Sequence, residues 1–371
     1  MTPPASAAGR GSQRAAPAAR LAPALALDVG GTRLRGAVVG PDGRLISRHA
    51  INTPGGDADT LVGACVRVLQ AALAEAGPMA AAPVAIGISA PGPLDARSGR
   101  LIDPPNLDRT TWGMPLAGLI ADALGLPAAL EKDTNVAALG EGTFGAARDV
   151  DDFIYLTVST GVGGAVVSGR RLLRGPDGVA GELGHLVVDA FAGPRCGCGA
   201  RGHLEALASG TGIAVAALEE GFGVRSSAAD VATAAERGDE RAARIIERAR
   251  AAFAAAIVTI VDVFNPSMVV VGGGVAAGQG ERLLRPARER VAAEAFAVQA
   301  RRAKIVPAQL GDDVCLVGAL VLANAALNPG LAPLGLKPRA TRPGRSALPK
   351  RPPGGDDEGG IIPTTTAVAT R

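Results

Sequence analysis

The fold class is decided by residues 25–39, which read LALDVGGTRLRGAVV. A short apolar run meets the Gly30–Gly31 pair and continues into an alternating apolar run, which is typical of a β-hairpin. The pattern returns at residues 153–168, which read FIYLTVSTGVGGAVVS. Two hairpins, each built on a glycine-rich turn and each opening one half of the chain, predict a duplicated fold.

Outside the hairpins, short apolar runs alternate with segments that have helical spacing. We expect strands at 44–50, 84–89, 128–132, 268–271 and 304–309, and helices at 57–76, 134–141, 241–264, from about 281, and at 314–327. This alternation predicts an α/β fold of mixed layers. A ligand held between the halves would meet both glycine-rich turns, whose backbone N–H groups can approach anionic oxygens closely.

The charge of the chain is distributed unevenly. The net charge is +3, but residues 1–20 carry +3 and residues 328–371 carry +4, so the body between them is mildly acidic. An acidic body argues against nucleic acid as a partner. Both ends are rich in Pro, Ala, Gly and Thr, and we expect them to be disordered because they cannot bury enough apolar surface to order.

The apolar pattern argues against membrane insertion and secretion. The longest apolar run, residues 252–261, is far shorter than the roughly 20 residues that a membrane-spanning helix needs. The N-terminus carries Arg and Ala but lacks the apolar segment of a secretory signal. We therefore expect a cytoplasmic protein with no membrane partner.

The first candidate site is the run Asp28–Thr32. Gly30 and Gly31 let the backbone fold around a phosphate, and Thr32 offers a hydroxyl. Asp28 could orient a water bound to Mg²⁺, which prefers carboxylate and phosphate oxygens. The alternative is that the glycines serve only a tight hairpin turn.

Two more glycine-rich runs follow strands later in the chain. The second candidate is Thr160, Gly161 and Gly163, in the turn of the repeated hairpin. The third is Gly272, Gly273 and Gly274, which could let the adenosine of a nucleotide lie on the backbone or could simply allow close packing of a helix on a strand. The spacing is not that of a Walker A motif, so a P-loop is excluded.

The fourth candidate is a cluster of soft metal ligands, His185, Cys196, Cys198 and His203, within 19 positions. Zinc takes four such ligands in a tetrahedron, and a closed set of four leaves no place for a reactive water. We therefore expect a structural Zn²⁺ that fixes the loop bearing Glu182 and Glu205.

The motifs together resemble the ROK family of sugar kinases (repressor, open reading frame, kinase). The resemblance covers residues 24–325 and rests on DVGGT, APGPLD, PNL, EKDTNVAALGE, STGVGG, GELGH, CGCGARGHLE and VVGGGV, in this order. It implies an actin-like, ribonuclease-H-like fold of two α/β domains that close on sugar and ATP. It also implies a homodimer or homotetramer.

The resemblance assigns roles to individual residues. The catalytic base would be Asp133, which takes the proton of the sugar hydroxyl while the γ-phosphoryl group of ATP is transferred with Mg²⁺. Glu182, His185 and Glu205 would contact sugar hydroxyls, with Asn106 as a weaker candidate. Asp133 also directly precedes a predicted helix, so its side chain could cap that helix.

Two positions depart from the family pattern. His203 stands where the family usually has a cysteine, and imidazole also binds zinc. Lys132 stands where the family usually has an asparagine that contacts the sugar. Lysine donates hydrogen bonds but cannot accept them. Its side chain could bind a different pattern of sugar hydroxyls, lower the basicity of Asp133, or point away from the site.

We expect four segments. They are a disordered extension at 1–20, an N-terminal domain at 21–132 plus 313–327, a C-terminal domain with the zinc loop at 133–312, and a disordered tail at 328–371.

The favoured activity is ATP-dependent phosphorylation of glucose to glucose 6-phosphate. The alternatives are N-acetylglucosamine or N-acetylmannosamine as acceptor, polyphosphate as donor, and a sugar sensor with weak catalysis. A sugar-responsive repressor is disfavoured because about 20 residues before the first strand cannot form a winged helix.

Overall fold

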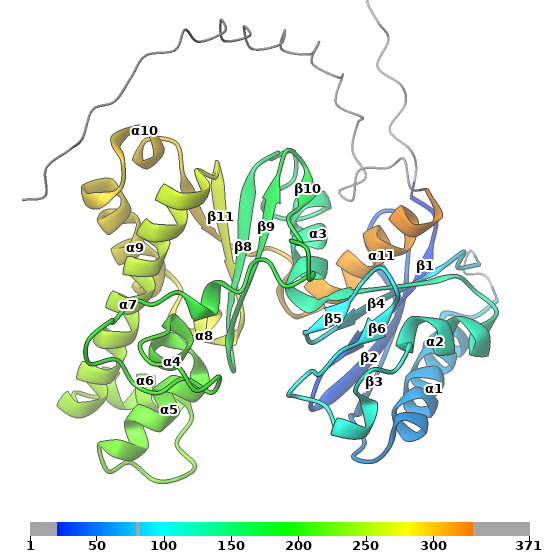
Figure 1. Ribbon diagram of the computed structural model, residues 1–371, viewed down its shortest axis with the longest axis horizontal. Helices are drawn as coiled ribbons and strands as arrows, with labels where there is room; N and C mark the ends of the chain where they lie inside the picture. Colours follow the sequence, from blue (N-terminus) through cyan, green and yellow to red (C-terminus); the bar gives the residue numbers. More distant parts are fainter. Residues whose placement is uncertain (1–20, 79–81, 329–371) are drawn as a thin grey trace, which may run out of the picture. The chain divides into compact units, whose positions relative to one another are not determined.

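The computed structural model describes residues 21–78 and 82–328, and within them the chain forms two five-stranded sheets (Figure 1). The first sheet has the order β3-β2-β1-β4-β7, with β1 Ala24–Val29, β2 Arg33–Val39, β3 Leu45–Asn52, β4 Ile86–Ala90 and β7 Ala128–Lys132. The second has the order β10-β9-β8-β11-β12, with β8 Phe153–Val158, β9 Val162–Ser168, β10 Arg171–Leu172, β11 Met268–Gly272 and β12 Lys304–Pro307. The predicted disordered segments lie outside the described residues, apart from Asn328.

The two sheets share one construction, so the predicted duplication is confirmed. In each sheet a hairpin pairs antiparallel, β1 with β2 and β8 with β9. In each sheet the first strand of that hairpin then pairs parallel with a later strand, β1 with β4 and β8 with β11. The carboxyl ends of β1, β8 and β11 lead into the three glycine-rich candidate runs.

Helices cover both sheets and also lie between them. The outer face of the first sheet packs against α1 Ala58–Ala76 and α2 Leu116–Leu124. A shared core joins the other face to the second sheet through α3 Asp133–Thr143 and α11 Val314–Leu327. The far face of the second sheet is covered by α4 Leu204–Ala208, α5 Gly210–Glu219, α6 Ala228–Glu236, α7 Glu240–Phe264, α8 Gly274–Gln279 and α9 Glu281–Glu294. The short elements are β5 Leu94–Asp95, β6 Arg100–Leu101 and α10 Ala297–Ala300, and no described helix is long and apolar enough to cross a membrane.

The alternation of large and small residues in β1 explains which helices pack on each of its faces. Leu25, Leu27 and Val29 face α1 and α2, whereas Ala24 and Ala26 face α11. Successive side chains of a strand point to opposite faces, so one face of β1 is bulky and the other is small. The small face lets α11 approach the sheet closely.

Three glycines mark the tightest contacts of this middle layer. A Cβ on Gly87 of β4 would lie 2.0 Å from the carbonyl oxygen of Ala319 in α11. A Cβ on Gly318 would lie 1.9 Å from the carbonyl oxygen of Val136 in α3, and one on Gly140 would lie 2.8 Å from that of Val314. Backbone thus packs on backbone between α3 and α11, and no larger residue fits.

The sequence located most elements but missed some helices. The strand expected at 84–89 begins two residues later, at Ile86. Helix α8, which starts directly after β11, was not predicted, and neither were the helices between 204 and 236. These segments are rich in Gly and Ala, so they show little apolar periodicity.

We expect the Gly318→Ala substitution to lower the free energy of unfolding by about 1–3 kcal/mol, because an added methyl group must displace backbone. Urea denaturation of the purified chain measures this change. Gly118→Ala in α2 is the matched control, since open space surrounds that position, and it should be neutral or stabilise by about 0.4–1 kcal/mol. Equal stability of the two variants would contradict the close contact between α3 and α11.

Candidate active site

Asp133 lies where β7 ends and α3 begins. It is the first residue of α3, and Lys132 occupies the N-cap position without a capping side-chain hydrogen bond. The prediction that Asp133 itself could cap α3 is therefore wrong by one position, although its Oδ1 does accept a hydrogen bond of 2.7 Å from the backbone N–H of Thr134. Burial raises the pKa of the Asp133 carboxyl to about 6, while that N–H and the charge of Lys132 act in the opposite direction. A carboxylate of this pKa can accept a proton near neutral pH.

The Lys132 ammonium forms an ion pair with Glu182. Its Nζ lies 2.5 Å from Glu182 Oε1, and the two residues come from opposite halves of the chain. The Lys132 side chain is nearly buried, whereas that of Glu182 is 42% exposed. Lys132 therefore lies beside both the predicted base and a predicted sugar contact.

Glu131, which was not predicted as a site residue, stabilises the segment that carries Lys132 and Asp133. It is fully buried, and its Oε2 accepts a 2.7 Å hydrogen bond from Nε of Arg174. Its Oε1 accepts from the backbone N–H of Lys132 and from Asn135 Nδ2. A buried carboxylate needs such partners, and the EKDTN spacing could have shown that a carboxylate precedes the base.

Asp28 is engaged by the protein at both carboxylate oxygens. Its Oδ2 pairs with Arg35, at 2.6 Å from Nη2, and its Oδ1 accepts a 2.7 Å hydrogen bond from Ser89 Oγ. Arg35 also donates to the carbonyl oxygen of Asp312, just before α11. A magnesium-bound water at Asp28 would share the carboxylate with these partners.

The first glycine-rich turn meets the loop that bears Asn106. A Cβ on Gly31 would lie 2.7 Å from the carbonyl oxygen of Asn106. Thr53 stabilises the turn through two hydrogen bonds: its backbone N–H donates to the carbonyl oxygen of Thr32, and its hydroxyl donates to that of Gly30. The structure thus brings Asn106 to the Asp28–Thr32 turn.

The second glycine-rich turn meets both Glu205 and α3. Glu205 Oε2 accepts a 3.0 Å hydrogen bond from the backbone N–H of Val162, and a Cβ on Gly161 would lie 2.6 Å from the same oxygen. A Cβ on Gly163 would lie 2.8 Å from Thr134 Cγ2, one residue after Asp133. A larger residue at 161 or 163 would therefore displace the side chain of Glu205 or Thr134, and the turn touches the helix that carries Asp133.

The third run, Gly272–Gly274, lies beside the second turn. Gly273 has a φ of +94°, and its Cβ would lie 2.4 Å from the carbonyl oxygen of Val158. A Cβ on Gly272 would lie 2.8 Å from the hydroxyl of Tyr155. Close packing thus accounts for these two glycines, whereas a Cβ on Gly274 would meet only Ser159 Oγ, at 3.8 Å.

The four predicted metal ligands lie together. One ligand atom from each of His185, Cys196, Cys198 and His203 lies within 4.8 Å of the other three. The two Nδ1 atoms of His185 and His203 are 3.1 Å apart, and Cys198 Sγ is 3.4 Å from His203 Nδ1. The ligand atoms of a tetrahedral zinc site lie about 3.3–3.8 Å apart, so small shifts of these side chains would bring the cluster to that geometry.

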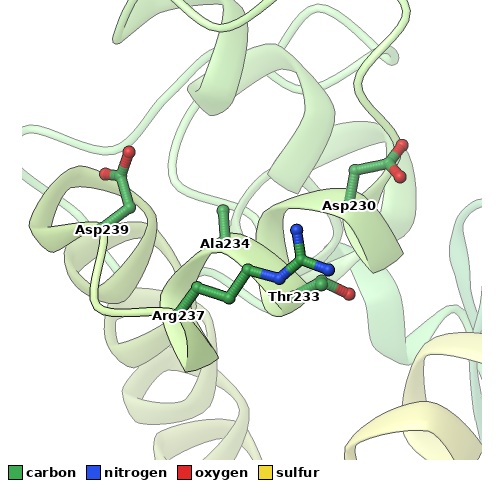
Figure 2. A pocket seen from close by; sticks show the side chains of 5 residues that line it. All are labelled: Asp230, Thr233, Ala234, Arg237 and Asp239. Carbon is green, nitrogen blue, oxygen red and sulfur yellow. The ribbon is translucent and has the colours of Figure 1, made fainter.

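A surface depression of about 440 Å³ lies away from these residues, between α6 and the start of α7. Figure 2 shows its lining, with Asp230 and Asp239 on either side of Arg237. Both carboxylates already cap helices, Asp230 in the capping box of α6 and Asp239 at the N-terminus of α7. The depression contains none of the candidate site residues.

Comparisons with known proteins identify relatives over most of this chain. The sequence model described as the ROK family matches residues 24–326. A glucokinase of Thermotoga maritima is 33% identical over 312 residues, which cover 80% of this chain and 95% of that protein. An N-acetylmannosamine kinase of Shigella boydii is 36% identical over 300 residues, covering 81% of this chain and 98% of that protein.

A solved structure extends the similarity to three dimensions. The crystal structure of a ROK family glucokinase from Streptomyces griseus, in complex with glucose and AMPPNP, superposes with a TM-score of 0.66 at 32% identity. The match covers 81% of this chain and 99% of that chain. The duplicated two-domain, actin-like α/β fold expected from the sequence is thereby confirmed, and the chain belongs to the ROK family of sugar kinases.

Proposed function

We propose that this chain transfers the γ-phosphoryl group of ATP to a hydroxyl of glucose, giving glucose 6-phosphate in the cytoplasm. The observation that carries the proposal is the buried Asp133 carboxyl at the start of α3, whose pKa is about 6. The glucokinases of Thermotoga maritima and Streptomyces griseus support glucose as the acceptor. The slightly higher identity to N-acetylmannosamine kinases supports an N-acetylhexosamine as the second candidate.

In the reaction, the Asp133 carboxylate accepts the proton of the acceptor hydroxyl. The hydroxyl oxygen forms its bond to the γ-phosphorus as the bond from that phosphorus to the bridging oxygen of ADP breaks. Phosphoryl transfer has little covalent chemistry for a protein to perform, so positioning and charge neutralisation supply most of the rate. Mg²⁺, carried with ATP near Asp28, would neutralise phosphate charge.

The phosphates would lie against the two glycine-rich turns. The first contributes Gly30, Gly31 and Thr32, and the second contributes Thr160, Gly161 and Gly163. Tight turns present backbone N–H groups to anions without adding a side chain in the way. The adenosine would lie near Gly272–Gly274, where Gly274 is the position that packing leaves open.

The sugar would lie beside Asp133, in contact with residues from both halves. We assign the contacts to Asn106, Lys132, Glu182, His185 and Glu205. The boundary between the proposed domains, 21–132 plus 313–327 and 133–312, falls between Lys132 and Asp133. The sugar would therefore bridge the two domains. We further propose a homodimer or homotetramer.

Replacing Asp133 by Asn removes the proton acceptor at nearly constant shape. We expect kcat for the best sugar to fall by about 10²- to 10⁴-fold, as for the loss of a general base. A coupled assay of ADP release measures kcat. Asp122→Asn, at an exposed position of α2, is the matched control and should retain full activity. Retained turnover in a folded Asp133→Asn variant would refute the role of Asp133.

The pH dependence of kcat/KM should reflect the same carboxyl. Because the base must be ionised, kcat/KM should fall as pH drops through about 6. The positive charge of Lys132 lowers the pKa of Asp133, so Lys132→Met should move this acid limb to higher pH. An acid limb that stays in place, or that moves to lower pH, would show that another group titrates.

We propose that the cluster of His185, Cys196, Cys198 and His203 holds a structural Zn²⁺. Four ligands close the coordination shell, so the metal would fix the loop and would take no part in proton transfer. His203, one of the four ligands, lies two residues before Glu205, whose Oε2 accepts a hydrogen bond from the N–H of Val162 in the second turn. The metal would thereby position a sugar contact and a phosphate turn together.

The purified chain should contain one zinc per chain by elemental analysis. Cys198→Ser should lose most of this zinc on dialysis and should melt at a lower temperature, because zinc binding stabilises the folded state. Cys65→Ala, which changes a buried cysteine in α1, is the control and should keep its zinc. A zinc-free wild type, or full zinc in Cys198→Ser, would contradict the assignment.

A further inference from the structure

Two ion pairs join the end of β7 to the loop before His185, and the charges in one pair run opposite to those in the other. From the first sheet, Glu131 receives Arg174 and Lys132 donates to Glu182. Arg174 and Glu182 both follow β10 of the second sheet. Each of the two segments therefore contributes one anion and one cation.

The partner of Lys132 is fixed by what surrounds it. Glu131 already accepts hydrogen bonds from Arg174, Asn135 and the backbone of Lys132. The Lys132 stem packs over Gly92, where an added Cβ would lie 3.6 Å from its Cδ. With its stem packed over Gly92 and both oxygens of Glu131 already engaged by other donors, the Lys132 ammonium pairs with Glu182.

Both members of the Lys132–Glu182 ion pair can form further hydrogen bonds. An ammonium has three N–H donors, and Glu182 is the one side-chain partner of Lys132 among the described residues. Glu182 is 42% exposed, and its Oε2 has no hydrogen-bond donor within the described chain. A charged donor and a charged acceptor thus lie side by side, next to Asp133.

We infer that Lys132 and Glu182 together determine specificity by binding one ring hydroxyl of the acceptor sugar. This inference rests on the proposed function, because that function places a sugar beside Asp133. A hydroxyl can accept from the Lys132 ammonium and donate to Glu182 Oε2 at once. A hydrogen atom makes neither bond, an ammonium can only donate, and a carboxylate can only accept. The subsite therefore favours a hydroxyl over a hydrogen atom, an ammonium or a carboxylate at that ring position.

The test measures sugar binding by calorimetry without nucleotide, so that it does not depend on phosphoryl transfer. The ligands are glucose and its 2-, 3- and 4-deoxy forms, and N-acetylmannosamine and its 3- and 4-deoxy forms. The proteins are the wild type, Lys132→Met, and the matched control Lys304→Met, which changes an exposed lysine of β12. Thermal melting checks folding, and Lys132→Gln replaces Lys132→Met if that variant does not fold.

For the wild type and for Lys304→Met, we expect one deoxy position to weaken binding by roughly 10- to 100-fold, the value of a hydrogen bond to charged groups. For Lys132→Met, the ratio of the Kd of that deoxy sugar to the Kd of its parent sugar should fall to roughly 3-fold or less, because one charged partner is gone. The same ratio at the other deoxy positions should stay unchanged. Such selective loss identifies the hydroxyl.

Three results would overturn the inference. They are a uniform weakening of all ligands by Lys132→Met, a wild type that tolerates every deoxy position, and a wild type that binds none of these sugars. Turnover separates this inference from the proposed function. If the sugar is phosphorylated but Lys132→Met changes no deoxy-to-parent Kd ratio selectively, only the role of Lys132 is refuted. If the ratio changes selectively at one position but no sugar is phosphorylated, only the kinase activity is refuted.

Discussion

The backbone contact between α3 and α11 is the constraint on which the rest of the structure depends. Gly87, Gly140 and Gly318 let strands and helices approach until carbonyl oxygens fill the space of a side chain. Protein interiors are packed as densely as crystals, so a contact this close tolerates little displacement. Because α3 begins with Asp133, the same contact that joins the two sheets also sets the position of the proposed base.

Burial and charge act on Asp133 in opposite directions. Burial alone favours the neutral acid, and the nearby carboxylates of Asp28 and Glu182 add to that effect. Lys132 and the N–H of Thr134 favour the carboxylate. The balance leaves a pKa of about 6, at which the group is mostly ionised at neutral pH and still basic enough to accept a proton. Lys132 is thus compatible with a base at the neighbouring position.

The sequence was sufficient for the parts of the molecule that local patterns encode. The two glycine-rich hairpins, the strands around them and the metal-ligand cluster follow from spacing within short segments, and the structure contains all of them. The pairs Arg174–Glu131 and Arg35–Asp28 were not predicted. The first pair joins positions 43 residues apart, and nothing in the local pattern of either segment points to the other. The glycines at 272 and 273 left two interpretations open, and only the distances to Tyr155 and Val158 show that packing requires them.

The central claim is that this chain phosphorylates a hexose with ATP, and direct detection of the product tests it most directly. Purified, zinc-loaded protein is incubated with Mg-ATP and, separately, glucose, mannose, fructose, N-acetylglucosamine and N-acetylmannosamine, and the products are identified by mass spectrometry. The account predicts a hexose monophosphate, with glucose 6-phosphate formed fastest, together with equimolar ADP. Folded protein that binds ATP and forms no sugar phosphate with any of the five sugars would contradict it.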